Sequence, residues 1–227
     1  MANILSIDAS TEYCSVALMC GNEVIEDCRN IPKAHALHLL PMVEKLLVES
    51  SISLQSLDAI ACNIGPGAFT GIRIAVSAAQ GLCYGADLPA IPVSTLANLA
   101  IQAFNQKDEI KQCLSAIDAR MNEVYFARFN LNDNGLPQLI DKEMVIGPEK
   151  IALSSMISDG SYLIGNGWNA YQEAFKNDDL SNFEIIQNSY PQAQYSLTIA
   201  KQAFDKNEVI KAEDLQPAYL RNNVVQQ

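Results

Sequence analysis

Apolar and polar positions in the first half of the chain predict three strands, followed by alternating helices and strands. Residues 3–8, 14–19 and 23–28 are short apolar or alternating segments, and Gly21 favours a hairpin turn between the last two. Residues 35–49 carry a helical apolar stripe that is wider than packing on one sheet face requires. We then expect a strand at 57–64, a helix at 68–84, a strand at 89–93 and a helix at 95–104.

After a polar segment at 105–112 the pattern begins again. Ser6-Ile7-Asp8-Ala9-Ser10 is echoed by Ala116-Ile117-Asp118-Ala119-Arg120, so that in each half an aspartate closes an apolar strand before a hairpin. An echo about half a chain apart suggests a duplicated α/β unit with two similar lobes. We therefore expect an N-terminal lobe at 1–104, a linker at 105–112 and a C-terminal lobe at 113–227.

The rest of the second half has a weaker pattern. Between 176 and 194 there is little periodicity, and we expect a loop there. The remaining elements that we expect are a strand at 137–146, a helix at 148–156, a strand at 162–164 and a helix at 196–204.

A glycine-rich turn joins the strand at 57–64 to the helix at 68–84. Its structural residues are Gly65, Pro66, Gly67 and Gly71. Such a turn can bind an anion at the helix N-terminus, or it can let two backbones pack closely. No Lys-Ser or Lys-Thr pair follows, so the pattern of a P-loop is missing.

Composition indicates a globular protein that does not hold nucleic acid by itself. The chain has 227 residues, 49% of them apolar, and a formal charge of −11. Its six cysteines form no C-x-x-C pair, and we expect reduced, buried thiols. Asp8 interrupts the first apolar run and no basic segment precedes it, which argues against a secretory signal and favours a cytoplasmic location.

Catalytic and metal-binding patterns are weak. His35 and His38 are the only histidines, and no nearby Asp, Glu or Cys at ligand spacing completes a metal site around them. No G-x-S-x-G motif or other nucleophile and base pattern occurs. We therefore expect no catalytic residue, no metal and no cofactor.

The helices at 35–49 and 68–84 predict an interaction surface. After Arg73 the second helix is uncharged nearly all round, so it must be buried on more than one side. Together the two helices would expose a larger apolar patch than soluble monomers usually tolerate. We expect this patch to be a helical interface.

The chain contains four further motifs, Ile7-Asp8-Ala9-Ser10-Thr11, residues 65–74, residues 117–125 and Tyr219-Leu220-Arg221-Asn222-Asn223. In this order and spacing they resemble the TsaB family of bacterial tRNA threonylcarbamoyladenosine biosynthesis proteins, historically grouped with glycoprotease-like sequences. The resemblance covers nearly the whole chain. It implies a two-lobed actin-like α/β fold, a duplicated ribonuclease-H-like unit with mixed sheets flanked by helices.

The resemblance also implies a function and partners. TsaB-like chains are the non-catalytic, activating partners of the related protein TsaD, which transfers a threonylcarbamoyl group to the adenosine beside the anticodon of ANN-decoding tRNAs. A TsaE-like ATPase joins them, and tRNA is reached only through the complex. We expect the two helices to pair with those of a homologous chain, as a homodimer alone and a heterodimer with TsaD. The expected interface residues are His38, Leu39, Met42, Val43, Leu46, Phe69, Ile72, Arg73, Val76 and Gln80, and a charge at Val76 should break association without unfolding the chain.

In actin-like ATPases, two hairpins hold the phosphates of the nucleotide. A degenerate nucleotide site would here comprise Asp8, Ser10, Thr11, Asp118, Gly165 and Gly167. The hairpins lack the glycines that let a backbone approach phosphates, and both aspartates could simply cap turns. Alternative functions are a nucleotide-hydrolysing or peptidase-like enzyme of the same fold, or a stand-alone homodimeric binding module.

Overall fold

The computed structural model describes residues 2–106, 109–156, 161–178, 183–187 and 189–221. Asn222 and Asn223 of the C-terminal motif lie outside the described residues. The chain forms two compact units, of which the first comprises Met1–Asn98 and Pro191–Ala218. The second comprises Leu99–Tyr190 and Tyr219–Gln227.

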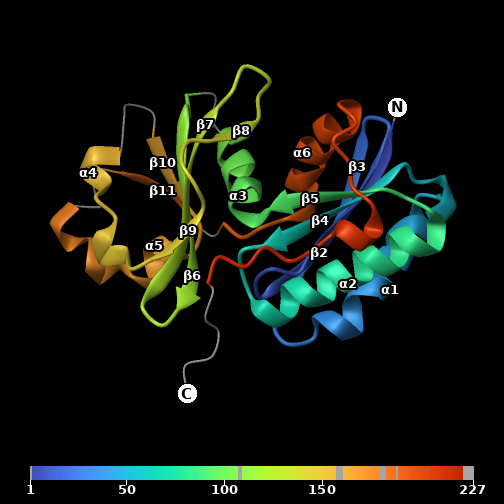
Figure 1. Ribbon diagram of the computed structural model, residues 1–227, viewed down its shortest axis with the longest axis horizontal. Helices are drawn as coiled ribbons and strands as arrows, with labels where there is room; N and C mark the ends of the chain where they lie inside the picture. The colour runs from blue at the N-terminus through green and yellow to red at the C-terminus, as the bar shows by residue number, and fades with distance from the viewer. Residues whose placement is uncertain (1, 107–108, 157–160, 179–182, 188, 222–227) are drawn as a thin grey trace. The chain divides into compact units, whose positions relative to one another are not determined.

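The first unit is built on a mixed sheet of five strands (Figure 1). Its strand order is β3-β2-β1-β4-β5. The first three strands pair antiparallel through tight turns, whereas β4 and β5 pair parallel because a helix separates each from the strand before it. The strands are β1 (Asn3–Asp8), β2 (Tyr13–Cys20), β3 (Glu23–Asn30), β4 (Ala59–Gly65) and β5 (Ala90–Ser94), and they confirm the expected strands of the first half.

Helices cover both faces of this sheet. On one face lie α1 (His35–Glu49) and α2 (Phe69–Ala86), next to each other (Figure 1). On the other face lies α6 (Ala193–Asp205), which packs on β1, β2, β4 and β5. The helix α3 (Thr95–Phe104) begins in the first unit and continues into the second.

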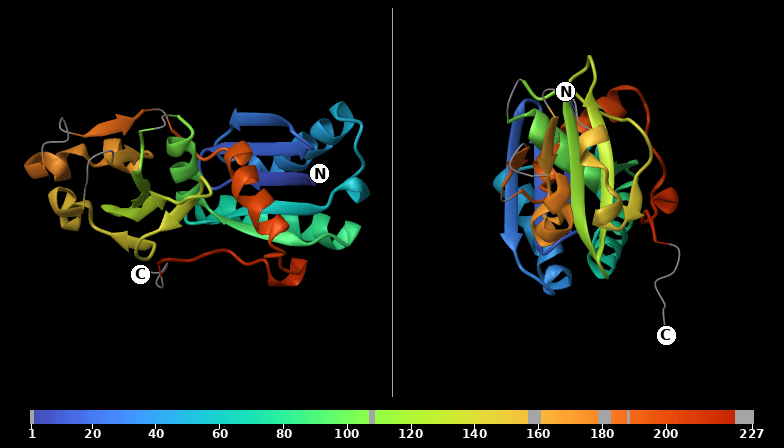
Figure 2. Two further views of the ribbon diagram at one scale, coloured as in Figure 1. Left: turned by 90° about the horizontal axis from the view of Figure 1, so that it is seen from above. Right: turned by 90° about the vertical axis from the view of Figure 1, so that its left-hand side faces the viewer.

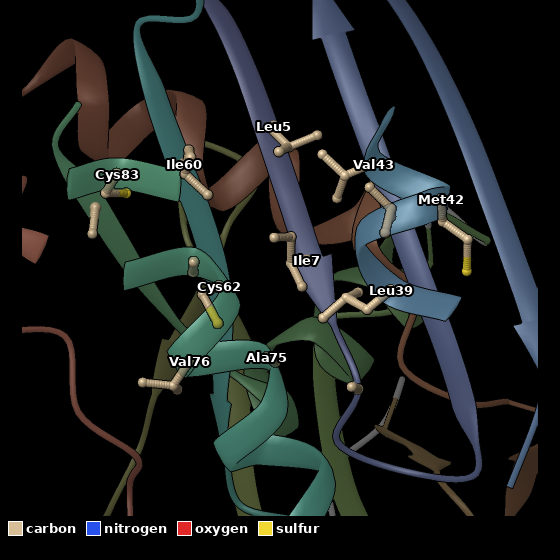
Figure 3. Close-up of a cluster of buried hydrophobic side chains, with 14 of the residues drawn as sticks. Leu5, Ile7, Leu39, Met42, Val43, Ile60, Cys62, Ala75, Val76 and Cys83 are labelled. Carbon is tan, nitrogen blue, oxygen red and sulfur yellow. The ribbon is translucent and has the colours of Figure 1, made fainter. Parts of the chain in front are cut away.

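Alternation along the strands creates the two cores of the first unit. Ile7 and Cys62 point to the side of α1 and α2, where they meet Val43 and Val76 (Figure 3). Neighbouring strand residues point the other way, so that Ile4 packs with Leu197 and Ala200 of α6. The period of two residues thus buries both faces of the sheet.

The second unit repeats this arrangement. Its strand order is β11-β10-β6-β7-β8, with β9 also pairing with β7. As in the first unit, the leading strand pairs antiparallel with the next strand and parallel with a later one, which confirms the duplication predicted from the sequence. The strands are β6 (Gln112–Arg120), β7 (Glu123–Leu131), β8 (Pro137–Leu139), β9 (Met144–Ile146), β10 (Ser161–Ile164) and β11 (Glu184–Ile186).

Three expectations for the second half were wrong. The expected strand at 137–146 is divided into β8 and β9, with the polar residues 141–143 between them. The expected helix at 148–156 is a 3-10 helix, Pro148–Lys150, followed after Ile151 and Ala152 by the short α4, Leu153–Met156. The expected loop at 176–194 contains β11, which is too short to show a period; α5 (Gly167–Ala170) and the 3-10 helix Gln172–Asp178 precede it.

The compact units differ from the expected lobes in the placement of α6. Residues 191–218 belong to the first unit, although the sequence places them late in the second half. The cause is that Ala193, Leu197 and Ala200 complete the core on the first sheet. After α6 and the 3-10 helix Ala212–Asp214, the described residues 215–221 form no helix or strand (Figure 2). The division of the chain into two domains stays a prediction.

Among the described helices, none combines the length and the apolar character that crossing a membrane requires.

Candidate functional site

The glycine turn packs directly on the β1–β2 hairpin. A Cβ atom at Gly67 would overlap the carbonyl oxygen of Ser10. The backbone N–H of Ala68 donates a hydrogen bond of 2.7 Å to that same oxygen. Gly65, which ends β4, has φ of +113° and therefore needs the freedom of glycine. The turn thus provides close packing, which is one of the two roles that its sequence allowed.

Asp8 is fully buried, and both of its carboxylate oxygens accept hydrogen bonds from other residues of the chain. One carboxylate oxygen accepts hydrogen bonds from the N–H and the hydroxyl of Ser10, both at 2.8 Å. The other oxygen accepts from the side-chain amide of Asn63. Burial raises the pKa of Asp8 to about 6, because desolvation outweighs these hydrogen bonds. Thr11, two residues further on, accepts a hydrogen bond from the N–H of Tyr13 at 3.3 Å.

Asp118 has the corresponding place in the second unit. One carboxylate oxygen accepts hydrogen bonds from the backbone N–H of Arg120 at 2.8 Å and from the hydroxyl of Tyr171 at 2.7 Å. The other oxygen lies 2.9 Å from the guanidinium of Arg120. Both aspartates therefore stabilise the turns that follow them, as the capping alternative predicted.

Gly165 and Gly167 also serve close packing. Gly165 has φ of +103°, and a Cβ atom there would overlap the carbonyl oxygen of Ala116 in β6. A Cβ at Gly167 would come within 3.0 Å of the Cβ of Ala116. In the expected nucleotide site, Asp8, Ser10 and Thr11 thus share a hairpin of the first unit, while Asp118 and both glycines cluster around β6.

The two histidines lie on α1 and have different surroundings. His35 is buried, with Nε2 3.3 Å from the carbonyl oxygen of Tyr13, whereas His38 is half-buried. In the part of the chain that the structure describes, no three His, Cys, Asp or Glu side chains are grouped to hold a metal ion.

The structure corrects the expected interface on α1 and α2. Val76 is 3% exposed and contributes to the core (Figure 3). A charge at Val76 would therefore disturb the fold itself and would not test association, contrary to the expectation from the sequence. The expected interface residues that the protein buries in its own core are Leu39, Met42, Val43, Leu46, Ile72 and Val76.

Four residues of that set remain partly or fully exposed. Phe69 and Arg73 are exposed, and the guanidinium of Arg73 lies 3.7 Å from the centroid of the Phe69 ring. Gln80 is half-buried, and its amide donates a hydrogen bond of 2.9 Å to the carbonyl oxygen of Leu215. The fourth is the half-buried His38.

The outer surface of α1 and α2 contains two adjoining apolar grooves, which we call the α1–α2 face. The first groove has a volume of about 570 Å³ and the second about 830 Å³, and Leu40 lines both. Leu40 is 50% exposed and Val48 72%. The first groove is lined by Ala36, Leu39, Leu40, Phe69, Thr70, Arg73, Ile74, Ser77 and Ala78. The second is lined by Leu40, Pro41, Val43, Glu44, Leu47, Val48, residues 51–54 and Leu82.

The exposed apolar stripe of α1 is not the stripe that was expected to form the interface. Both Leu39 and Leu40 belong to apolar stripes, and periodicity does not tell which stripe meets the sheet. The structure buries Leu39 and exposes Leu40. The signal for an exposed apolar face was the excess width of the pattern, and it was present in the sequence.

Two units with the same sheet order, each with an aspartate stabilising its first hairpin, define an α/β protein of the actin-like fold. The chain belongs to the TsaB family within this class. It is 39% identical to the tRNA threonylcarbamoyladenosine biosynthesis protein TsaB of Escherichia coli, over 97% of this chain and 95% of that protein. It is 37% identical to the protein of the same name from Haemophilus influenzae, over 97% of this chain and 94% of that one.

Two further comparisons agree with this assignment. The family model described as TsaD, tRNA N6-adenosine threonylcarbamoyltransferase, matches residues 29–227. A crystal structure from Pseudomonas aeruginosa, described as an uncharacterized protein with similarity to peptidase YEAZ, superposes with a TM-score of 0.90. It is 37% identical and covers 97% of this chain and 100% of that one.

Proposed function

We propose that this chain is a non-catalytic, activating subunit of the complex that transfers a threonylcarbamoyl group to the adenosine beside the anticodon of ANN-decoding tRNAs. The names of the relatives in Escherichia coli and Haemophilus influenzae support the pathway. The observation that carries the accessory role is the contrast between two regions. The hairpins that would hold a nucleotide are occupied by hydrogen bonds and backbone contacts within the protein itself. The α1–α2 face, in contrast, is apolar and contains a surface groove.

The accessory role is supported by the first hairpin, whose polar atoms already make hydrogen bonds within the protein. Asp8 directs both carboxylate oxygens to its own hairpin and to Asn63. Gly67 and Gly71 press the start of α2 against the backbone of Ala9 and Ser10. A phosphate group at this hairpin would have to compete with these contacts, and each broken buried hydrogen bond costs about 1–3 kcal/mol.

The α1–α2 face supports association with a homologous chain. Its grooves are lined mainly by apolar side chains, including Leu40, Ile74 and Leu82. Partly exposed apolar helices gain stability when a second helical pair covers them. We assign this face to a TsaD-like catalytic paralogue, and to a second copy of this chain in its absence.

The acidic charge is consistent with a subunit that does not hold tRNA alone. A formal charge of −11 gives net repulsion from phosphate groups, so the other subunits would supply the basic contacts. A TsaE-like ATPase completes the proposed complex, which operates in the cytoplasm.

Association is tested by mixing this chain with a TsaD homologue and measuring mass by light scattering after size exclusion. We expect a heterodimer for the unmodified chain and for Leu139→Glu, because Leu139 is exposed in β8 of the other unit. Leu40→Glu should prevent the heterodimer while the circular dichroism spectrum stays unchanged. A heterodimer of normal strength with Leu40→Glu would exclude this face. If the chain forms homodimers and no heterodimer in the presence of the TsaD homologue, the result would favour the stand-alone binding module.

A further inference from the structure

A buried polar cluster lies beneath the N-terminal end of α6. The strand register sets Asp8 of β1 opposite Ser15 of β2, and Ala17 opposite Glu26 of β3. Ser15 and Ala17 point to the α6 side of the sheet, so Asp8 and Glu26 belong to that side as well. The first turn of α6 thus meets two carboxylates of the first sheet.

Side chains of the sheet cap this helix. Gln192, at the N-cap position, makes no side-chain capping bond in the described structure. The N–H of Ala193 donates to the hydroxyl of Ser15 at 2.9 Å, and the N–H of Gln194 donates to Glu26 Oε1 at 3.0 Å. The Ser15 hydroxyl in turn donates to the same Glu26 oxygen at 2.7 Å. Free N–H groups of the first helical turn are therefore bound by β2 and β3.

A second path connects α6 to Asp8. Ser196 of α6 donates to Asn63 Oδ1 at 2.5 Å, and Asn63 donates to the Asp8 carboxylate. Asn98 of α3 donates to the Ser196 hydroxyl at 2.6 Å and to the carbonyl oxygen of Gln192 at 2.7 Å. These side chains form one continuous chain of hydrogen bonds from Asp8 to the start of α6.

The cluster contains two buried carboxyl groups that disfavour each other's negative charge. Burial raises the pKa of Asp8 and of Glu26, and the negative charge of Glu26 raises the pKa of Asp8 further. The N-terminal end of α6 offsets part of this cost, because its helix dipole favours negative charge.

Within the described residues, the hydrogen-bond partners of Asp8 and Glu26 include no cationic side chain. On β3, Asp27 lies beside Glu26 and is paired with Arg29 and with Lys45 of α1. Cys28 of β3 lies opposite Ser15, and burial, followed by the charges of Glu26 and Asp8, raises the pKa of its thiol. Burial, followed by the charge of Asp8, also raises the pKa of the thiols of Cys14 on β2 and Cys62 on β4. The groups that face the cluster from β4, α3 and α6 are the neutral Asn63, Asn98 and Ser196.

We propose that Asp8 and Glu26 form a pH-sensitive latch that holds α6 on the first sheet more tightly as the pH falls. In the docked state a proton is taken up more readily than in the undocked state, where water reaches both carboxylates. Docking is therefore strengthened at low pH, and this gain is lost as the pH rises through about 6, the pKa of docked Asp8.

The latch has a consequence beyond α6. The chain continues from α6 to Ile210, which forms a bridge with Ala90, and to Leu215, whose carbonyl oxygen binds Gln80 of α2. Tighter docking of α6 therefore also favours the docking of the segment that packs on α2.

Hydrogen exchange of the α6 amides tests the latch, with protection corrected for the intrinsic exchange rate at each pH. With a pKa of about 6 for docked and about 4 for undocked Asp8, protection should rise about tenfold between about pH 7 and about pH 5. Asp8→Asn should remove most of this rise. Glu26→Gln should reduce it, while retaining the Oε1 acceptor.

The matched control is Glu208→Gln, which neutralises an exposed carboxylate beyond the end of α6 and should leave the rise intact. Protection that does not change with pH in the unmodified chain would overturn the proposal. Equal rises in α6 protection for Glu26→Gln and Glu208→Gln would also overturn it. This comparison tests the proposal even if the Asp8→Asn variant does not fold.

Discussion

Gly71 of α2 lies against the backbone carbonyl of Ala9 in the β1–β2 hairpin, so closely that a Cβ atom at position 71 would overlap the oxygen. Gly67 has the same relationship to Ser10. The start of α2 is therefore in contact with the hairpin itself. Glycine is required at these positions because two backbones touch.

This contact predicts that Gly71→Ala destabilises the protein by about 2–3 kcal/mol, since the added methyl group must move the hairpin or the helix. Gly81 of the same helix is the matched control, because a Cβ there meets no atom within 4 Å. Gly81→Ala should stabilise by about 0.5–1 kcal/mol through its helix propensity. Urea unfolding measures both, and equal effects of the two variants would contradict the contact.

Val76 and Leu40 should respond differently to charge. Val76→Asp should lower the free energy of unfolding by more than about 3 kcal/mol, because the carboxylate would be buried without a partner in the core between the first sheet and α1 and α2. Leu40→Glu should change stability by less than about 1 kcal/mol, because Leu40 is 50% exposed. Thermal unfolding of the isolated variants checks this, and similar losses would mean that the burial of these helices is assigned incorrectly.

Tyr171→Phe should destabilise the second unit by about 1 kcal/mol, the usual net contribution of one hydrogen bond. Its hydroxyl donates to Asp118 at 2.7 Å, and the rest of the ring is unchanged by the substitution. Asp118→Ala should cost more, because the N–H of Arg120 also loses its acceptor. Unfolding followed by Trp168 fluorescence reports on this unit; a smaller loss for Asp118→Ala than for Tyr171→Phe would count against the turn-capping role.

The cysteines should differ in reactivity. All six are free thiols, and burial raises the pKa of Cys14, Cys28 and Cys113 to about 12. Cys20, at the end of β2, is partly exposed, and its pKa is raised less. With a thiol reagent at mildly alkaline pH we expect Cys20 to be labelled first. Rapid labelling of fully buried Cys113 in the folded protein would contradict the core as described.

Much of the fold follows from local patterns. The strands β1 to β3 and the helix α1 were predicted because their periods are long and regular, and Asp8 and Asp118 revealed the duplication. The short strand β11 has no pattern long enough to detect.

Long-range relationships could not be predicted. The hydrogen bond from Ala193 to Ser15 joins residues 178 positions apart, and no local pattern in the sequence predicts it. For the same reason the return of α6 to the first unit was missed. The outward direction of Leu40 depends on how α1 is rotated on the sheet, which the apolar pattern alone leaves open.

The most direct test of the proposed function is threonylcarbamoyl transfer to tRNA, with ATP, bicarbonate, threonine, the adenylate-forming enzyme and TsaE present. We expect transfer when this chain and TsaD are combined, strong loss with Leu40→Glu, and normal transfer with Leu139→Glu. Transfer by this chain without TsaD would contradict the non-catalytic role, and full activity of TsaD without this chain would contradict the activating role.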